Sequence, residues 1–185
     1  MATLKAKTDI LLIIKKDHQN VKKLIGKLAK IAEKPSKEVP KDATRLAFEL
    51  MLHAKAEEIA LYEACETYNL KFRDFVLEGY HEHALLEDML KKLLVTMPDK
   101  NGEFKAVLTV IKELVEHHAE EEEEKEMFPK IRKAFSLQQR QEMGRMMQKQ
   151  KIVLKPQILS HTQQVDVEEV FPPKTQNLTE ELLLN

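Results

Sequence analysis

Three histidine–glutamate pairs in this chain share a spacing of four residues: His53 with Glu57, His83 with Glu87, and His118 with Glu122. On an α-helix, residues i and i+4 lie on the same face, so the imidazole and the carboxylate of each pair can reach the same ion. A glutamate run such as residues 120–124 is usually a solvated helix face, and a single inward histidine is usually a core residue. Recurrence on separate helices favours a metal site over both of these interpretations.

The phase of the surrounding apolar residues indicates which way His118 points. Upstream of it, apolar residues recur at helical spacing: Phe104, Val107, Leu108, Ile111, Leu114 and Val115. His118 lies seven residues after Ile111, so it continues this apolar stripe and is predicted to face the core. Its neighbour His117 falls off the stripe and is predicted to be exposed.

The composition predicts an all-α protein with one main domain. The 185 residues include four glycines, seven prolines and no tryptophan, together with many good helix formers. Lys and Arg number 30 against 31 Asp and Glu, so no strong positive field attracts nucleic acid or a membrane surface. We therefore expect neither nucleic acid nor a membrane among the partners.

The amino-terminal region and the cysteine content favour a cytoplasmic protein. The apolar run from Ile10 to Ile14 is too short for a spanning helix and is not followed by a small-residue cleavage site. Cys65 is the single cysteine, so it cannot form an internal disulfide, which fits a reducing compartment. We interpret Cys65 as a small buried apolar residue, because it lies four residues after Leu61.

Apolar periodicity predicts four long helices, followed by a shorter one. The predicted long helices cover residues 8–33, 41–67, 72–94 and 103–128. Their short connections favour an up-down-up-down four-helix bundle. Ser136 and Gln139 form the pattern of a capping box, which predicts a short fifth helix over 137–149. We assign 1–150 to the bundle and 151–185 to an irregular C-terminal tail that is mobile or docks on a protein partner.

Each of the four long helices contributes one histidine in the inward phase: His18, His53, His83 and His118. His81 lies off the stripe of the third helix, so we discount it in favour of His83. Glu57, Glu87 and Glu122 stand one turn from three of the four histidines. Burying ionised carboxylates costs several kcal/mol each unless a cation offsets the charge, so a metal ion is expected among them.

The types of ligand restrict which metal is expected. With one cysteine, the chain offers no thiolate set for a zinc finger or an iron–sulfur cluster. Calcium prefers a cage of oxygen ligands to four imidazoles, whereas mixed imidazole and carboxylate ligands suit iron or manganese. The number of candidate ligands exceeds what one ion uses. Two ions bridged by carboxylates fit best, with one or two positions open to a small ligand.

The motifs resemble those of the hemerythrin-like, or HHE cation-binding, domain over residues 8 to 150. The resemblance lies in HAKAEE at 53–58, EHALLE at 82–87 and HHAEEE at 117–122, with His18 matching the first-helix histidine. It implies a four-helix bundle that holds two non-heme iron ions in an oxo- or hydroxo-bridged centre. The metal-binding roles that it implies fall on matching positions: His18, His53, Glu57, His83, His118 and Glu122.

This sequence departs from the oxygen carriers that it resembles at one position. The carriers have two histidines one turn apart on the third helix, whereas here Glu87 follows His83. An anionic ligand in this place would favour ferric iron, so we expect oxidation by oxygen rather than reversible oxygen carriage. Glu87 is predicted either as a ligand or as a hydrogen-bond partner of a ligand histidine.

Three classes of function remain open at this stage. The first is a di-iron binding protein that interacts with O2, NO or peroxide in sensing, iron and oxygen handling, or stress defence. The second is a di-iron enzyme that decomposes peroxide or reduces nitric oxide. The third is an interaction module stabilised by its metal. No sequence feature indicates the physiological ligand or the oligomeric state.

Overall fold

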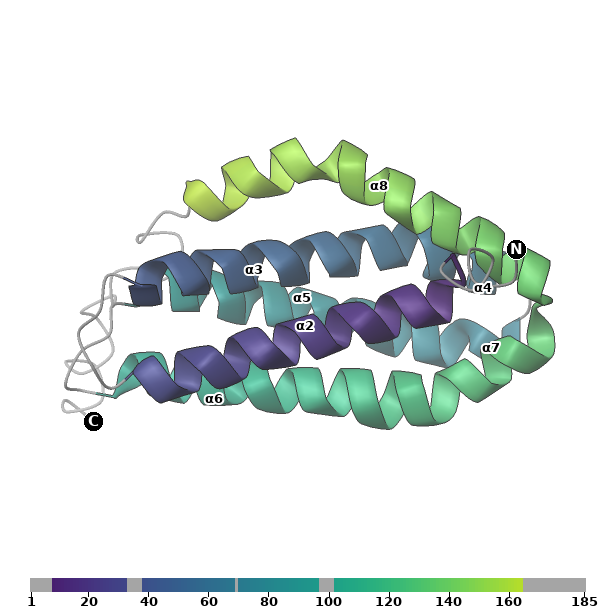
Figure 1. The fold of residues 1–185 in the computed structure, drawn as a ribbon. Coiled ribbons are helices and arrows are strands. Elements are labelled where there is room, and N and C mark those ends of the chain that lie inside the picture. Colours follow the sequence, from purple (N-terminus) through teal and green to yellow (C-terminus); the bar gives the residue numbers. More distant parts are fainter. Residues whose placement is uncertain (1–7, 33–37, 69, 97–101, 165–185) are drawn as a thin grey trace, which may run out of the picture.

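The computed structural model describes residues 8–32, 38–68, 70–96 and 102–164, and within these ranges it is helical with no strand. Four helices form the bundle: α2 (Ile10–Ile31), α3 (Glu38–Glu57), α5 (Arg73–Val95) and α6 (Glu103–Glu116). Each packs against the next along the chain, and α6 returns to contact α2, which closes the bundle (Figure 1). The predicted all-α four-helix bundle is therefore confirmed.

The predicted second and fourth helices are not α-helical throughout. A π-helix, η1 (Glu58–Tyr62), follows α3 and leads into α4 (Glu63–Tyr68), and the 3-10 turn η2 (Leu70–Phe72) precedes α5. A longer π-helix, η3 (His117–Met127), follows α6 and leads into α7 (Phe128–Ala134). π-helical segments are often found at functional sites. Segment η3 contains the predicted ligands His118 and Glu122, and η1 begins directly after the predicted ligand Glu57.

Helix α8 (Leu137–Gln163) is much longer than the fifth helix predicted from sequence. Its start was predicted correctly, because Ser136 and Gln139 form the capping box. Its predicted end at residue 149 is wrong, and the proposed boundary at residue 150 falls inside the helix. Pro156 is accommodated on the exposed face, where the carbonyl oxygen that loses its partner can be solvated. Residues 165–185 of the predicted tail lie outside the described residues.

Helix α8 packs along α2 and α3 and is fixed at its N-terminal half by two contacts (Figure 1). Arg140 Nε donates to Asp9 Oδ2 at 3.1 Å, and Asp9 also caps the start of α2. Gly144 approaches α2 so closely that a Cβ atom there would lie 1.9 Å from the Thr8 carbonyl oxygen. Only glycine therefore allows α8 to approach at this point.

The apolar core consists of two clusters, one toward each end of the bundle. One cluster contains Val21, Leu50, Leu86 and Val115, and the other contains Ile14, Ala60, Tyr62, Phe128 and Met147. Between them lies a layer of buried polar side chains that includes His18, His53, Glu57, His83, His118 and Glu123. Every helix in the described ranges is too short or too polar to span a bilayer.

Candidate metal centre

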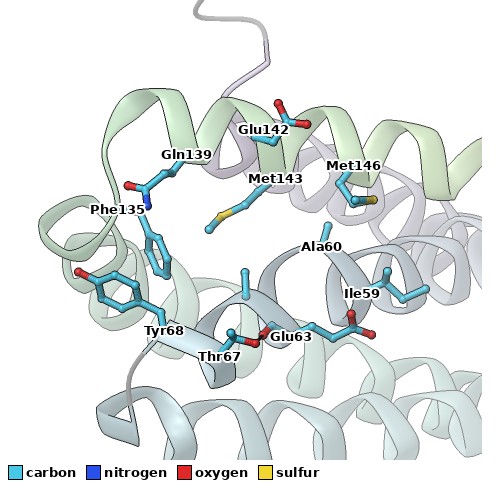
Figure 2. Close-up of a pocket in the computed structure, with 11 residues that line it drawn as sticks. Ile59, Ala60, Glu63, Thr67, Tyr68, Phe135, Gln139, Glu142, Met143 and Met146 are labelled. Atoms are coloured by element: carbon cyan, nitrogen blue, oxygen red, sulfur yellow. Dashed lines mark hydrogen bonds between the residues drawn. The ribbon is translucent and has the colours of Figure 1, made fainter.

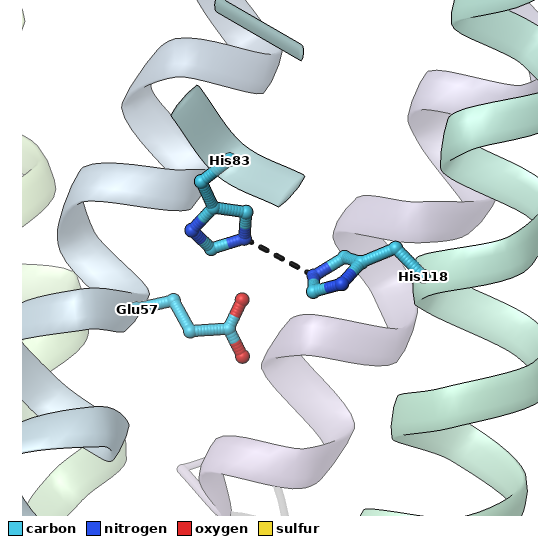
Figure 3. A group of neighbouring side chains, drawn as sticks. All are labelled: Glu57, His83 and His118. Atoms are coloured by element: carbon cyan, nitrogen blue, oxygen red, sulfur yellow. Dashed lines mark hydrogen bonds between the residues drawn. The ribbon is translucent and has the colours of Figure 1, made fainter. Parts of the chain in front are cut away.

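Four histidines converge between the two apolar clusters, one from each wall of the bundle. His18 comes from α2, His53 from α3, His83 from α5 and His118 from η3, and all four are buried. Figure 3 shows His83 and His118 pointing toward each other, with the carboxylate of Glu57 beside both rings. One ligand atom from each of these three residues lies within 4.8 Å of the other two, which is close enough to share one ion.

On its outer side, each histidine Nδ1 atom meets a carboxylate. The four pairs are His18 with Glu124 at 3.2 Å, His53 with Asp17 at 3.1 Å, His83 with Glu58 at 3.1 Å and His118 with Glu82 at 2.6 Å. An imidazole that donates its Nδ1–H to a carboxylate presents the lone pair of Nε2 on the opposite side. The carboxylates therefore orient all four rings so that Nε2 faces the centre.

On the inner side, the Nε2 lone pairs face groups that repel them unless a proton or a metal cation lies between. The Nε2 atoms of His83 and His118 are 3.1 Å apart. When both rings are neutral and protonated at Nδ1, this contact brings two lone pairs together, which is unfavourable in a buried site. A proton on His118 Nε2 would turn the contact into a hydrogen bond to His83. A positive ion between the rings removes this repulsion.

Two buried carboxylates complete the inner group. Glu57 is 0% exposed, and its Oε2 lies 3.2 Å from His53 Nε2. Glu123 is 2% exposed, and its Oε2 lies 3.2 Å from His18 Nε2 while its Oε1 lies 3.8 Å from His118 Nε2. These carboxylates come from α3 and η3, so they approach the histidines from different helices.

The inner atoms have the properties of a cation site. Within the described part of the chain, buried atoms without a hydrogen-bond partner include His18 Nε2, His53 Nε2, both carboxylate oxygens of Glu57, and Glu123 Oε2. Buried polar atoms are almost always hydrogen-bonded, because leaving one unpaired costs about 1–3 kcal/mol. Nitrogen and oxygen atoms that could ligate a metal, and that converge without hydrogen-bond partners, fit a bound cation, which would contact all of them.

Neighbouring charges set the protonation of the histidines in the absence of a cation. Burial opposes a charged His53, but Asp17 and Glu57 outweigh it and raise its pKa to about 9. Burial of His83 prevails over its hydrogen bond to Glu58 and lowers its pKa to about 4. For His118, nearby carboxylates led by Glu123 overcome burial and hold the pKa well above its ordinary value. A proton on His53 or His118 must therefore leave before a cation binds.

The buried Tyr62 borders the centre, although sequence analysis did not single it out. Its hydroxyl donates to Glu123 Oε1 at 3.4 Å, and its ring stacks on His83 with centroids 5.5 Å apart. Burial and the charges of Glu123 and Glu57 raise the pKa of Tyr62 well above its ordinary value, so the hydroxyl keeps its proton. A Cβ atom at Gly79 would lie 2.4 Å from this hydroxyl, so glycine makes room for it.

The structure brings Glu123, which the sequence analysis missed, into the inner group with His18. The pairing of His118 with Glu122 assumed an α-helix, but η3 is π-helical, and the Phe128 N–H donates to the Glu123 carbonyl five residues back. Glu123 thereby takes the inward position. A signal was present, because counting back by four from Ile131 and Met127 reaches Glu123.

Glu122 and Glu87, both singled out in the sequence analysis, lie outside the inner group. Glu122 forms an outer group with Glu82 and His118 whose ligand atoms lie within 4.8 Å of one another. Glu87 Oε1 lies 3.2 Å from Lys91 Nζ, and its Oε2 lies 4.0 Å from Lys55 Nζ. Its carboxylate is thus paired with lysines at the edge of the bundle.

The remaining histidines lie away from the inner group. His81 and His117 are exposed, as their helical phase predicted. His161, near the end of α8, is also exposed. The structure thus separates these three from the four buried histidines.

A separate cavity of about 660 Å³ lies between α8 and the segment formed by η1 and α4 (Figure 2). Its lining is mainly apolar and includes Ile59, Tyr68, Phe135, Met143 and Met146. Among the described residues that line it, only Glu63 and Glu142 carry carboxylates. Glu142 is paired with Arg145 in an ion pair, so this cavity does not resemble the histidine-rich centre.

Comparison with known proteins agrees with this geometry. The family description "Hemerythrin HHE cation binding domain" matches residues 9–147, which include all the inner histidines and both inner carboxylates. Searches of curated proteins and of solved structures gave no match. The matched segment spans most of the chain and ends within α8. The chain therefore belongs to the hemerythrin HHE cation-binding domain family.

Proposed function

We propose that the chain binds two non-heme iron ions through six side chains: His18, His53, Glu57, His83, His118 and Glu123. The histidines form two pairs, with ring centroids 5.0 Å apart for His18 and His53 and 4.8 Å apart for His83 and His118. The observation that carries the proposal is that each inner carboxylate faces both pairs, since Glu123 lies near His18 and His118. Glu57 likewise lies near His53 and is grouped with His83 and His118.

Iron is favoured over other metals by the kind of donor in the inner group. Four imidazoles and two carboxylates suit iron, whereas a thiolate set would favour zinc or an iron–sulfur cluster. Cys65 packs in the apolar cluster beside the centre, and burial, followed by the charges of Glu57 and Glu123, raises its pKa to about 12. Its thiol therefore stays protonated and is a poor metal ligand.

The space beside the histidines supports a small exogenous ligand. A small cavity of about 20 Å³ is lined by the four histidines and, among other residues, by Val21, Leu50, Leu86 and Val115. A cavity needs roughly 10–15 Å³ to hold one water molecule, so this one suits O2, NO or peroxide and excludes larger substrates. When bound, iron would supply a position that binds and activates a small oxidant.

An enzymatic role, in which the centre decomposes peroxide or reduces nitric oxide, is the second candidate. The observation that favours it is the buried hydroxyl of Tyr62, which lies 3.4 Å from Glu123 Oε1 and can hold a proton at the edge of the centre. For either role we propose a cytoplasmic location, where the reduced Cys65 is stable.

Anaerobic titration of the metal-free protein with ferrous iron tests the proposal. We expect saturation at about two ions per chain, and saturation at one ion contradicts the two-ion centre. The matched variants are His83→Ala, which should lose iron, and His81→Ala, which should retain it because His81 is exposed. Optical spectra with O2, NO and peroxide then test ligand binding, and turnover under excess peroxide distinguishes an enzyme from a binding protein.

A further inference from the structure

Lys151 on α8 reaches the outer side of the metal centre. Its Nζ forms an ion pair with Asp17 Oδ2, and the same oxygen accepts the hydrogen bond from His53 Nδ1 at 3.1 Å. We propose that Lys151 is a positioning residue of the metal centre, acting through Asp17 to fix the ring orientation and tautomer of His53. This inference rests on the proposed function, because His53 is one of its six ligands.

The position of Lys151 within α8 supports a specific role. The face of α8 that packs on the bundle carries Met147, Lys151, Leu154 and Ile158, at spacings of three or four residues. Lysine is an unfavourable choice in such a stripe, because its ammonium group loses hydration unless it is paired. Lys151 is paired with Asp17, and both side chains are largely covered, at 23% and 21% exposed.

The other three outer carboxylates are held by groups inside the matched family segment, residues 9–147. Glu124 Oε2 lies 2.5 Å from Lys15 Nζ, and Glu58 Oε2 lies 3.2 Å from Lys55 Nζ. Glu82 Oε1 lies 4.0 Å from His117 Nε2. Asp17 differs, because its lysine lies beyond residue 147 on α8. Helix α8 therefore supplies a part of the centre that the rest of the bundle does not.

The anchoring of α8 makes Lys151 a fixed donor rather than a mobile surface lysine. The contact at Gly144 and the Arg140–Asp9 ion pair fix the helix before Lys151, and the buried Ile158 fixes it after Lys151. Because α8 is held on both sides, the contact with Asp17 orders the Lys151 side chain but does not have to order the helix backbone as well. A donor that is fixed in this way can orient the carboxylate that it binds.

Cation binding and the packing of α8 should then be thermodynamically linked. If the Lys151–Asp17 contact favours the binding orientation of His53, a bound cation must favour that contact by the same free energy. The linkage gives α8 a role in the centre, although α8 carries none of the six proposed ligands.

A double-mutant cycle on the full-length protein tests the inference. The probe is Co²⁺, followed by its visible absorption as it is titrated into metal-free protein. We expect Lys151→Met to weaken Co²⁺ binding roughly 10-fold, the lower end of the usual effect of outer hydrogen-bond partners of metal ligands. Lys151→Met should have no further effect in an Asp17→Asn background. Lys149→Met, which removes an exposed lysine from the same helix, should leave the affinity unchanged.

Nitrogen-15 NMR of His53 in the metal-free protein provides a readout that does not depend on a metal. Above about pH 9, where the His53 ring is neutral, the wild type should show the tautomer protonated at Nδ1, and Lys151→Met should show a mixture of the two tautomers. If the wild type binds no Co²⁺ yet the variant shows this tautomer change, the proposed function fails and the positioning role stands. The positioning role is overturned if Lys151→Met leaves the tautomer unchanged, if Lys149→Met matches its effect, or if its effect persists in Asp17→Asn.

Discussion

Glu123 Oε2 lies 3.2 Å from His18 Nε2, and neither atom has a hydrogen-bond partner within the described part of the chain. The contact joins α2 to η3 across the interior of the bundle. Two buried polar atoms this close without a hydrogen bond are unfavourable in an apolar interior, and a bound cation would satisfy both.

Glu123→Gln should abolish tight cation binding. The change removes the negative charge from the inner group, so the loss of affinity should exceed the roughly 10- to 100-fold effect typical of outer partners. Glu122→Gln and Glu87→Gln are matched controls that remove the same charge outside the inner group, and both should retain two ions per chain. Iron quantitation after anaerobic loading measures all three. Retention of iron by Glu123→Gln with loss by Glu122→Gln would mean that Glu122, and not Glu123, takes the inward position.

Gly79→Ala should destabilise the protein by about 1–3 kcal/mol, the usual effect of overpacking a core. The new methyl group would lie 2.4 Å from the Tyr62 hydroxyl, so the tyrosine must move away from Glu123. Gly26→Ala is the control, because it lies within α2 and a Cβ atom there meets nothing within 4 Å. That control should stabilise the helix by about 0.5–1 kcal/mol. Chemical denaturation of the metal-free variants measures both changes, and equal effects would refute the predicted contact.

Cation affinity should rise with pH across the neutral range. Since the pKa of His53 is raised to about 9, its ring is protonated at pH 7 without a cation, and binding must displace that proton. Each displaced proton makes the affinity increase roughly 10-fold per pH unit until the pH passes about 9. Competition titrations with Co²⁺ at several pH values measure the slope. A slope of zero would mean that His53 is already neutral.

The same pKa has the opposite effect on the stability of the metal-free fold. A folded-state pKa of about 9 for His53, above the ordinary 6.5, means that the folded state holds this proton more tightly. The contribution to stability is fully present below pH 6.5 and is lost as the pH rises through about 9. Denaturation of the metal-free protein at pH 6 and pH 9 should therefore show a higher free energy of unfolding at pH 6. The difference between the two pH values should be smaller in His53→Gln, which lacks the titrating ring.

Cys65 should be unreactive in the native protein. It is 0% exposed, and burial, reinforced by the charges of Glu57 and Glu123, raises its pKa to about 12, so almost no thiolate exists at pH 8. A thiol reagent such as dithionitrobenzoate should label one cysteine per chain rapidly in denaturant and extremely slowly without it. Rapid labelling under native conditions would place Cys65 at the surface.

The amino-acid sequence determined the bundle and the four inward histidines. The 3.6-residue period of apolar positions in an α-helix places His18, His53, His83 and His118 on buried faces, and short connections allow the helices to alternate in direction. Glu57 was also predicted correctly as buried, because it lies in α3 before the π-helical turn begins. These features depend on local periodicity, which a single sequence displays.

Only the tertiary structure decided which carboxylate of the glutamate run faces the histidines. Five consecutive glutamates, residues 120–124, offer the same side chain at every helical phase, so composition cannot choose among them. The π-helical turn of η3 brings Glu123 rather than Glu122 to His18. No intrinsic propensity of a glutamate run predicts a π-helix, and its register depends on contacts with the other helices.

The tertiary structure also decided the outer contacts and the course of α8. Asp17 is separated by 36 residues from His53 and by 134 residues from Lys151, so no local pattern encodes the contact that joins all three. Lys151 and Pro156 interrupt the apolar stripe of α8, which is why periodicity alone ended the helix too early. The fold explains the lysine in this stripe, because Asp17 lies opposite Lys151 and pairs with its charge. A lysine is stable in a covered position once its charge is paired.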